Sequence, residues 1–158
     1  MLQYILSFVV LISVVVFVHE YGHYYFAKKY KVGVTDFSIG FGKELFGFND
    51  KDGTRWKICA IPLGGYVKFF GDSNSASQPV SLSKIDDKDH SKLLTTKPLY
   101  QRAIIVSAGP IANFILAIFI FSLIFMTVGK DITVPIITEV QQNSPASTAG
   151  LKSNDQIS

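Results

Sequence analysis

The chain has 158 residues, 48% of them hydrophobic and 17% charged, with a formal net charge of +3 and one cysteine, Cys59. This is the length of one ordinary domain, but the apolar residues gather in two blocks separated by a polar, glycine-punctuated stretch. A single cysteine excludes an internal disulfide, and the sequence has no basic stretch interleaved with aromatic residues, so we expect no nucleic-acid partner.

The first apolar block, residues 1–18, contains no charged side chain. If the helix continues to residue 30, it has the roughly 20 apolar residues that a bilayer requires. A secretory signal peptide is the competing interpretation, but it would have a basic start and a small-residue cleavage site. Neither is present, and bulky Phe17 and Tyr21 stand where cleavage would fall. We therefore expect residues 1–30 to form a retained transmembrane helix.

The end of this helix contains the motif His-Glu-x-x-His, formed by His19, Glu20 and His23. Positions four residues apart lie on one face of a helix, so both imidazoles can reach one zinc ion at roughly 2.0–2.1 Å. Glu20 is suited to accept a proton from water beside such an ion. The motif therefore predicts a Zn²⁺ site with Glu20 as the general base.

An alternative is that both histidines lie at the membrane interface, with their polar tips among lipid headgroups. This explains their polarity, but not the ligand spacing with a glutamate in the general-base position. Polar groups at membrane depth are costly to bury, and such residues usually mark functional sites. The metal-site interpretation is therefore the stronger one.

Residues 31–70 combine short β-prone runs with glycine, asparagine and aspartate, and Asp52-Gly53 is typical of a hairpin turn. They predict a small sheet with more aromatic surface than it can bury by itself. The sheet is either a small soluble insert or a membrane-associated sheet that dips into the bilayer beside the first helix. In the second case its open edge would face a water-filled cavity.

Residues 71–102 are rich in serine, aspartate and lysine, and they predict a mobile, polar, cytoplasmic linker. The second apolar block follows, and we expect residues 103–129 to form a second transmembrane helix. Its early half contains small and polar residues that let helix backbones approach. Pro110 in this half frees a backbone carbonyl that a neighbouring group must satisfy.

Lysine and arginine predict the orientation of both helices. They flank the exit of the first span and the entry of the second, whereas only Lys130 closely follows the second span. The flanking residues are Lys28, Lys29, Lys31, Lys92, Lys97 and Arg102. Because positive charge near a span favours the cytoplasmic side, we expect a cytoplasmic middle segment and both ends outside.

Five stretches together resemble the site-two protease family of intramembrane zinc metalloproteases, most closely its bacterial regulator-of-sigma-E protease branch. In chain order they are HEYGH, FSIGFGKELF, IPLGGYVK, QRAIIVSAGPIANFILA and NSPASTAGLKSNDQI. The last is similar to the opening of a PDZ domain, which residues 130–158 would begin. The implied fold is a mainly α membrane protein with two transmembrane helices, a small membrane-associated β-sheet between them and the start of a PDZ-like domain.

The resemblance also implies roles for the matching residues. His19 and His23 would bind zinc, and Glu20 would be the catalytic glutamate. The strand that receives the substrate would comprise Gly64, Gly65, Tyr66, Val67 and Lys68. Pro110 and Asn113 would bound the catalytic cavity, with Asn113 either donating to substrate or making an ordinary hydrogen bond between helices.

One part of the family's zinc site has no counterpart in this sequence. The family completes the site with an aspartate on a later transmembrane helix, and no aspartate here lies within an apolar span. We therefore expect an amino-terminal portion of such a protease, inactive by itself, whose third zinc ligand lies beyond this chain.

The expected function is intramembrane proteolysis by a multi-pass zinc endopeptidase of the bacterial inner membrane. Its substrates would be transmembrane regulatory proteins such as anti-sigma factors, with the active site near the cytoplasmic side and the PDZ-like part in the periplasm. A non-catalytic, membrane-anchored PDZ-type adaptor or pseudoenzyme is the alternative. A soluble zinc protease is less consistent with the sequence, because its motif helix would be amphipathic.

Overall fold

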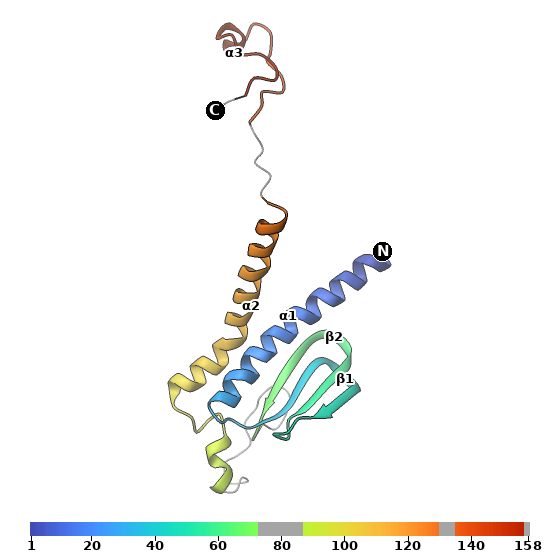
Figure 1. The fold of residues 1–158 in the computed structure, drawn as a ribbon, viewed down its shortest axis with the longest axis vertical. Coiled ribbons are helices and arrows are strands. Elements are labelled where there is room, and N and C mark those ends of the chain that lie inside the picture. The colour runs from blue at the N-terminus through green and yellow to red at the C-terminus, as the bar shows by residue number, and fades with distance from the viewer. Residues whose placement is uncertain (73–86, 130–134, 157–158) are drawn as a thin grey trace. The chain divides into compact units, whose positions relative to one another are not determined.

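The computed structural model describes residues 1–72, 87–129 and 135–156. The chain forms two compact units, Met1–Ile120 and Phe121–Ser158. The elements in chain order are α1 (Leu2–Lys29), β1 (Val34–Asn49), β2 (Arg55–Phe69), the 3-10 helix η2 (Asp87–Lys92), α2 (Leu99–Thr127) and α3 (Pro145–Thr148) (Figure 1). The expected pair of long apolar helices, with a small antiparallel sheet between them in the chain, is confirmed.

Both long helices present apolar side chains outward. Each is long and apolar enough to cross a membrane, and in α1 none of the most hydrophobic 18-residue stretch is buried. The core helix of a soluble protein would be mostly buried, whereas lipid is a favourable surrounding for a helix whose backbone groups are all paired internally. The exposed apolar surface is typical of a membrane protein.

The chain leaves α1 through a tight turn at Lys31, which has a positive φ of 56°. The backbone N–H of Val32 donates to the carbonyl of Ala27 at 2.8 Å, and that of Lys31 donates to Lys28 at 3.0 Å. This is the hydrogen-bond pattern of a Schellman motif. Ala27, Val32 and the start of β1 belong to one buried cluster, so the turn returns the chain to the helix that it has just left.

β1 and β2 pair antiparallel, and both are long and irregular, so two strands build a sheet four segments wide. Residues 34–39 of β1 lie between residues 65–69 and residues 55–58 of β2, and residues 55–58 also pair with residues 46–49. Residues 65–69 therefore form one edge of the sheet. Figure 1 shows the sheet alongside α1.

β1 changes direction at Gly40, between its two paired halves. Gly40 is buried and has a φ of 86°, a left-handed conformation that favours glycine. A Cβ at this position would also lie 2.8 Å from the carbonyl oxygen of Ile61. The bend that gives the sheet its width therefore requires glycine.

Aromatic side chains attach the sheet to α1. Phe37 is 1% exposed and stacks on Trp56 with ring centroids 4.1 Å apart. Tyr24 of α1 meets both rings edge-on, 5.1 Å from Trp56 and 5.7 Å from Phe37. Aromatic pairs of this kind contribute about 0.5–1.5 kcal/mol each beyond their buried area. The sheet is thus held on the same helix that contains the histidine pair.

The turn between the strands is held by Asp50. Its Oδ1 accepts from the backbone N–H groups of Asp52 and Thr54 at 2.9 and 2.8 Å, and its Oδ2 accepts from Tyr24 Oη and Trp56 Nε1 at 2.9 and 3.3 Å. Burial raises the pKa of Asp50, but these hydrogen bonds outweigh burial and leave the pKa below its ordinary value. Ionised Asp50 therefore ties the hairpin turn to α1.

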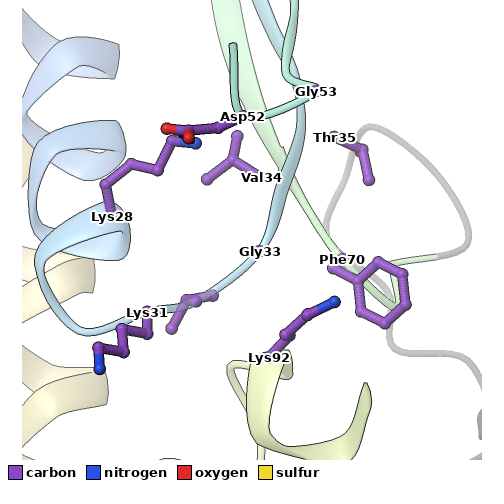
Figure 2. A pocket seen from close by; sticks show the side chains of 10 residues that line it. Lys28, Lys31, Gly33, Val34, Thr35, Asp52, Gly53, Phe70 and Lys92 are labelled. Carbon is purple, nitrogen blue, oxygen red and sulfur yellow. Dashed lines mark hydrogen bonds and ion pairs between the residues drawn. The ribbon is translucent and has the colours of Figure 1, made fainter. Parts of the chain in front are cut away.

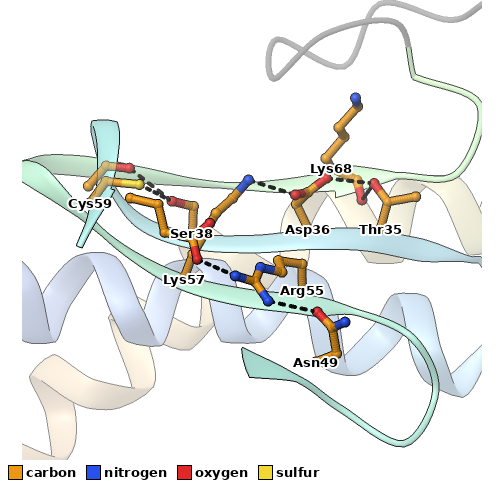
Figure 3. Close-up of polar contacts among 10 residues, drawn as sticks. Thr35, Asp36, Ser38, Asn49, Arg55, Lys57, Cys59 and Lys68 are labelled. Carbon is orange, nitrogen blue, oxygen red and sulfur yellow. Dashed lines mark hydrogen bonds and ion pairs between the residues drawn. The ribbon is translucent and has the colours of Figure 1, made fainter. Parts of the chain in front are cut away.

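A second polar cluster joins neighbouring segments within the sheet (Figure 3). Lys57 Nζ lies 2.6 Å from Asp36 Oδ1, and Thr35 Oγ1 donates to the same carboxylate at 3.0 Å. Burial by itself would raise the pKa of Asp36, but the hydrogen bonds from Lys57 and Thr35 lower it below its ordinary value. The pair is therefore ionised at neutral pH.

The end of the expected linker packs on the first unit. Leu93, directly after η2, is 3% exposed, and the backbone N–H of Gly33 donates to the Lys92 carbonyl at 2.9 Å. Residues 73–86 of that linker, for which we expected mobility, lie outside the described residues.

The second unit contains the end of α2 and residues 135–156 of the described chain. Ser144 caps α3 by accepting the backbone N–H of Ser147 at 3.2 Å, and Ile136 forms a β-bridge with Gln156. These contacts are too few to identify a fold, so the PDZ-like start expected over residues 130–158 remains a prediction. Residues 130–134 and 157–158 of it lie outside the described residues.

Candidate active site

α1 and α2 approach closely at small residues. A Cβ on Gly22 would lie 2.6 Å from the carbonyl oxygen of Ala108 and 3.1 Å from the Cβ of Ala112, so glycine is required there. Small residues let helix backbones meet, as is typical of helices packed in membranes. Gly22 lies inside the His-Glu-x-x-His motif, so this crossing brings the motif against α2.

The two histidines of α1 lie together at this crossing. The ring centroids of His19 and His23 are 4.9 Å apart, and their Nε2 atoms are 3.2 Å apart. Two nitrogens bound at roughly 2.0–2.1 Å to a tetrahedral zinc ion would be separated by about 3.3 Å. The observed spacing therefore fits a zinc ion shared by the two Nε2 atoms.

Each imidazole has a partner on α2 at its other nitrogen. His23 Nδ1 lies 2.8 Å from the backbone oxygen of Ile105, and His19 Nδ1 lies 3.2 Å from Asn113 Nδ2. A carbonyl oxygen only accepts, so His23 donates from Nδ1 and its Nε2 has a lone pair available for a metal. Partners of this kind orient the rings of metal-binding histidines.

Gly109 of α2 leaves open the space beside both Nε2 atoms. A Cβ at this position would meet His23 Nε2 and would lie 2.8 Å from His19 Nε2. The absent side chain therefore leaves a cradle next to the two ligand atoms, and any larger residue would fill it. Gly109 belongs to the site although it supplies no ligand atom.

The α2 residues of the site recur at every fourth position. Ile105, Gly109 and Asn113 therefore lie on one face of the helix. Only Asn113 is among the residues predicted from sequence. The four-residue spacing of Gly109 and Asn113 could have indicated that both lie on the helix face toward the site. A backbone carbonyl such as that of Ile105 cannot be recognised from a sequence. Pro110 is exposed, and the expectation that it bounds the cavity remains a prediction.

α2 bends along its first half, as Figure 1 shows. Pro110 lies inside the helix and is the physical cause, because proline has no N–H and its ring crowds the preceding turn. The carbonyl that Pro110 leaves without its usual donor belongs to Val106. The carbonyl that accepts from His23 is that of Ile105, next to it in the chain.

Glu20 lies where the edge of the sheet meets the motif helix. Its carboxylate accepts a hydrogen bond from the backbone of Val67. A Cβ on Gly65 would lie 3.1 Å from Glu20 Cγ and 2.7 Å from Val16 Cγ1, so glycine lets the edge segment approach α1. The structure thus brings two of the five predicted strand residues against the expected general base.

The other three predicted strand residues make contacts within the sheet. A Cβ on Gly64 would lie 2.9 Å from Phe41 Cζ, and Tyr66 stacks on the same ring with centroids 6.2 Å apart. The carbonyl of Lys68 accepts from Thr35 Oγ1 at 3.3 Å. These contacts hold the shape of the edge segment.

The described residues bring together two candidate metal ligands, His19 and His23. Within the described ranges, no group of three or more His, Cys, Asp or Glu side chains could hold a metal ion. Two imidazole nitrogens at a zinc-like spacing beside an open cradle fit zinc, and catalytic zinc sites use three protein ligands. The third ligand, which we expected beyond this chain, remains a prediction.

A separate polar pocket of about 460 Å³ lies at the end of α1 (Figure 2). Lys28, Lys31 and Lys92 line it. Lys28 pairs with Asp52 at 2.8 Å, and Lys92 pairs with Asp89 at 2.8 Å. Two of its three ammonium groups are thus already matched by carboxylates, and we assign this pocket no part in the site.

The sequence profile of peptidase family M50 matches residues 7–154. Curated proteins similar to the chain include "Putative zinc metalloprotease Atu1380" of Agrobacterium fabrum, which is 51% identical over 98% of this chain. "Putative zinc metalloprotease mll0638" of Mesorhizobium japonicum is 48% identical over 97% of the chain, and "Metalloprotease MmpA" of Caulobacter vibrioides is 42% identical over 97%.

The chain spans about two fifths of the length of these relatives: 41% of the first, 42% of the second and 41% of the third. The similarity therefore concerns one part of each relative, the part that aligns with the histidine pair, the sheet and α2.

Proposed function

Because the chain belongs to peptidase family M50, the site-two proteases that its motifs resemble, we propose that it forms the zinc-binding and base-bearing part of an intramembrane endopeptidase. One observation carries the proposal. The Nε2 atoms of His19 and His23 lie 3.2 Å apart on an apolar helix, beside the space that Gly109 leaves open. The names of the relatives, which include the words zinc metalloprotease, support zinc as the metal.

Zinc bound at this pair would polarise the scissile carbonyl and acidify a water molecule. Glu20 would accept the proton of that water and pass it to the leaving amine. In the free protein the Val67 backbone holds the Glu20 carboxylate at the edge of the sheet. Glu20 is thereby oriented by the sheet and is not needed as a ligand.

The substrate would add to residues 65–69 as an extended strand. This segment pairs with β1 on one side, so its other side can offer backbone donors and acceptors to a peptide. A transmembrane helix must unwind before its peptide bonds can be cut, and strand addition would hold the unwound chain beside Glu20. Our candidates for this contact remain Gly64, Gly65, Tyr66, Val67 and Lys68.

The exposed surface of the sheet supports a place within the bilayer rather than a soluble insert. Both strands expose large apolar side chains: Leu45, Phe46, Phe48, Ile58, Ile61 and Leu63. Exposed apolar surface on this scale is typical of a membrane or partner contact. We propose that the sheet dips into the membrane beside α1.

The same proposal covers location and substrates. The chain would belong to a multi-pass protein of the bacterial inner membrane, with its active site near the cytoplasmic side and the segment after α2 in the periplasm. The basic residues near the helix ends support this orientation. The substrates would be transmembrane regulatory proteins such as anti-sigma factors.

We also propose that an aspartate on a later transmembrane helix completes the zinc site, so that residues 1–158 alone do not cleave peptides. With two protein ligands an ion is held loosely, and water beside it is poorly aligned with Glu20. A misplacement of about 1 Å can cost on the order of 100-fold in rate.

The test uses the full-length protein in detergent, loaded with zinc and given a model transmembrane substrate. We expect one zinc per chain, and we expect His19→Ala and His23→Ala to remove both zinc and cleavage. Residues 1–158, assayed in parallel, should show no turnover that depends on Glu20. Full-length protein that binds zinc but does not cleave would favour the non-catalytic adaptor. Loss of cleavage without loss of zinc in both histidine variants would contradict the proposed site.

A further inference from the structure

We propose that Asn113 is a positioning residue of the zinc site, which sets the tautomer of His19 by turning its side-chain amide between the metal-free and metal-bound states. This inference rests on the proposed function and extends it to a residue outside the ligand set. The role assigned to Asn113 is toward His19, and it does not depend on a contact with the substrate.

The Asn113 amide uses one of its two polar atoms. Its Nδ2 lies 3.2 Å from His19 Nδ1. Its Oδ1 is buried and has no hydrogen-bond partner within the described part of the chain. A buried acceptor without a partner is costly. Half a turn of the amide would exchange the positions of Oδ1 and Nδ2, so the same side chain can present either a donor or an acceptor to the imidazole.

In the structure, three hydrogen bonds follow one another from Asn113 through His19 and His23 to Ile105, and each has one donor and one acceptor. Asn113 Nδ2 donates to His19 Nδ1, which places the His19 proton on Nε2. His19 Nε2 then donates to His23 Nε2 over 3.2 Å, and His23 Nδ1 donates to the Ile105 carbonyl over 2.8 Å. A neutral imidazole has one proton, and this arrangement accounts for the proton on each ring.

Metal binding requires a different arrangement, because both Nε2 atoms must then offer a lone pair. His23 already meets this condition through its contact with Ile105. The His19 proton must move from Nε2 to Nδ1, where it needs an acceptor. Asn113 Oδ1 becomes that acceptor once the amide has turned, and Nδ2 takes the buried position that Oδ1 holds in the structure. The ring keeps one proton throughout.

The two histidines therefore have different kinds of partner for a physical reason. The carbonyl of Ile105 can only accept, so it holds His23 in the metal-ready tautomer in both states. An asparagine can donate in one state and accept in the other, so His19 can pair with His23 when no metal is bound. Each imidazole then has a partner at both ring nitrogens in either state.

The test compares Asn113→Leu, Asn113→Asp and Ser107→Ala in the full-length protein in detergent. Leucine has a similar size but neither donates nor accepts, whereas aspartate accepts. Ser107 is exposed on the same helix and donates within it at 2.8 Å, so Ser107→Ala is the matched control. Zinc affinity is measured by chelator competition. The tautomer of His19 is measured by nitrogen NMR of histidine-labelled protein, metal-free and zinc-loaded.

We expect Asn113→Leu to weaken zinc binding by about 10–100-fold, the usual effect of losing the partner of a ligating histidine. Asn113→Asp should bind zinc at least as tightly as the unaltered protein, and Ser107→Ala should match it. NMR should show the His19 proton on Nε2 without zinc and on Nδ1 with zinc.

The inference is overturned if Asn113→Leu binds zinc as tightly as the unaltered protein, or if aspartate weakens binding as much as leucine. An unchanged His19 tautomer on zinc addition also overturns it. These results leave the proposed function intact as long as the unaltered protein binds zinc through His19 and His23. Unaltered full-length protein that binds no zinc would overturn both.

Discussion

His23 Nδ1 lies 2.8 Å from the backbone oxygen of Ile105, a residue 82 positions later in the chain. The acceptor belongs to the main chain of α2, so no side-chain substitution at Ile105 removes it. Through this contact the packing of two apolar helices decides which nitrogen of His23 faces the ligand space. The orientation of the candidate metal ligand is therefore a property of the helix crossing.

Gly109→Ala should weaken zinc binding without unfolding the protein. The new methyl group would occupy the space beside the Nε2 atoms of both histidines. We expect zinc affinity to fall by about 10–100-fold, as when ligand orientation is disturbed. Zinc affinity by chelator competition and helix content by circular dichroism check this, with Ser107→Ala as the control on the same helix. Unchanged zinc affinity would mean that the ion does not use this cradle.

Glu20→Gln should abolish cleavage by the full-length protein and leave its zinc content unchanged. Glutamine keeps the shape of the side chain but cannot accept the proton, and loss of a general base costs about 10²–10⁴-fold in rate. Turnover of a model transmembrane substrate and metal content of the same sample are the measurements. If zinc is lost together with activity, Glu20 is a ligand and our division of roles is wrong.

Val67→Pro should impair cleavage while zinc content is retained. Proline has no N–H, so it can neither bind Glu20 nor pair with a peptide added at the sheet edge. We expect a rate loss on the order of 100-fold, because the substrate and the base would both be displaced.

Leu63→Pro is the control for Val67→Pro. Leu63 is in the same strand but has no partner on β1 in the register. It is 62% exposed. Equal loss of cleavage in both variants would indicate that the strand is purely structural.

Asp50→Asn should release the hairpin turn from α1 and change the fluorescence of Trp56, the single tryptophan of the chain. Because hydrogen bonds lower the pKa of Asp50 in the folded protein, its contribution to stability is present above the ordinary value of about 3.9. That contribution is lost as the pH falls through the lowered pKa.

Acid titration with Trp56 emission as the readout tests this prediction. The unaltered protein should show a transition below pH of about 3.9, and Asp50→Asn should lack it. Asp36→Asn, which removes a carboxylate paired with Lys57 and not with Trp56, should retain the transition. A transition that persists in Asp50→Asn would assign it to another carboxylate.

Cysteine labelling in intact cells checks the proposed orientation. Cys59 is the single cysteine of residues 1–158 and is 5% exposed, so Cys59→Ala removes the native thiol from these residues. We expect an impermeant reagent to label Ser144→Cys in intact cells and Ser75→Cys only after the cells are opened. The opposite pattern would reverse the topology.

The sequence by itself determined the features that depend on local pattern. Two uncharged apolar blocks predict two membrane-type helices, and both are present. The spacing of His19 and His23 predicts neighbouring imidazoles, and their Nε2 atoms are 3.2 Å apart. Such features follow from helix periodicity and side-chain chemistry alone, so no knowledge of distant contacts was needed.

Tertiary structure decided the features that depend on which residues meet across the chain. Gly109 and Ile105 are part of the site only because α2 crosses α1 at Gly22, where small residues let the backbones touch. Likewise, Glu20 reaches the backbone of Val67 only because the strands bend and place their edge against the helix. A main-chain oxygen has no chemical signature in a sequence, and a glycine in a sequence does not show what lies beside it, so only packing brings Ile105 and Gly109 to the candidate metal site.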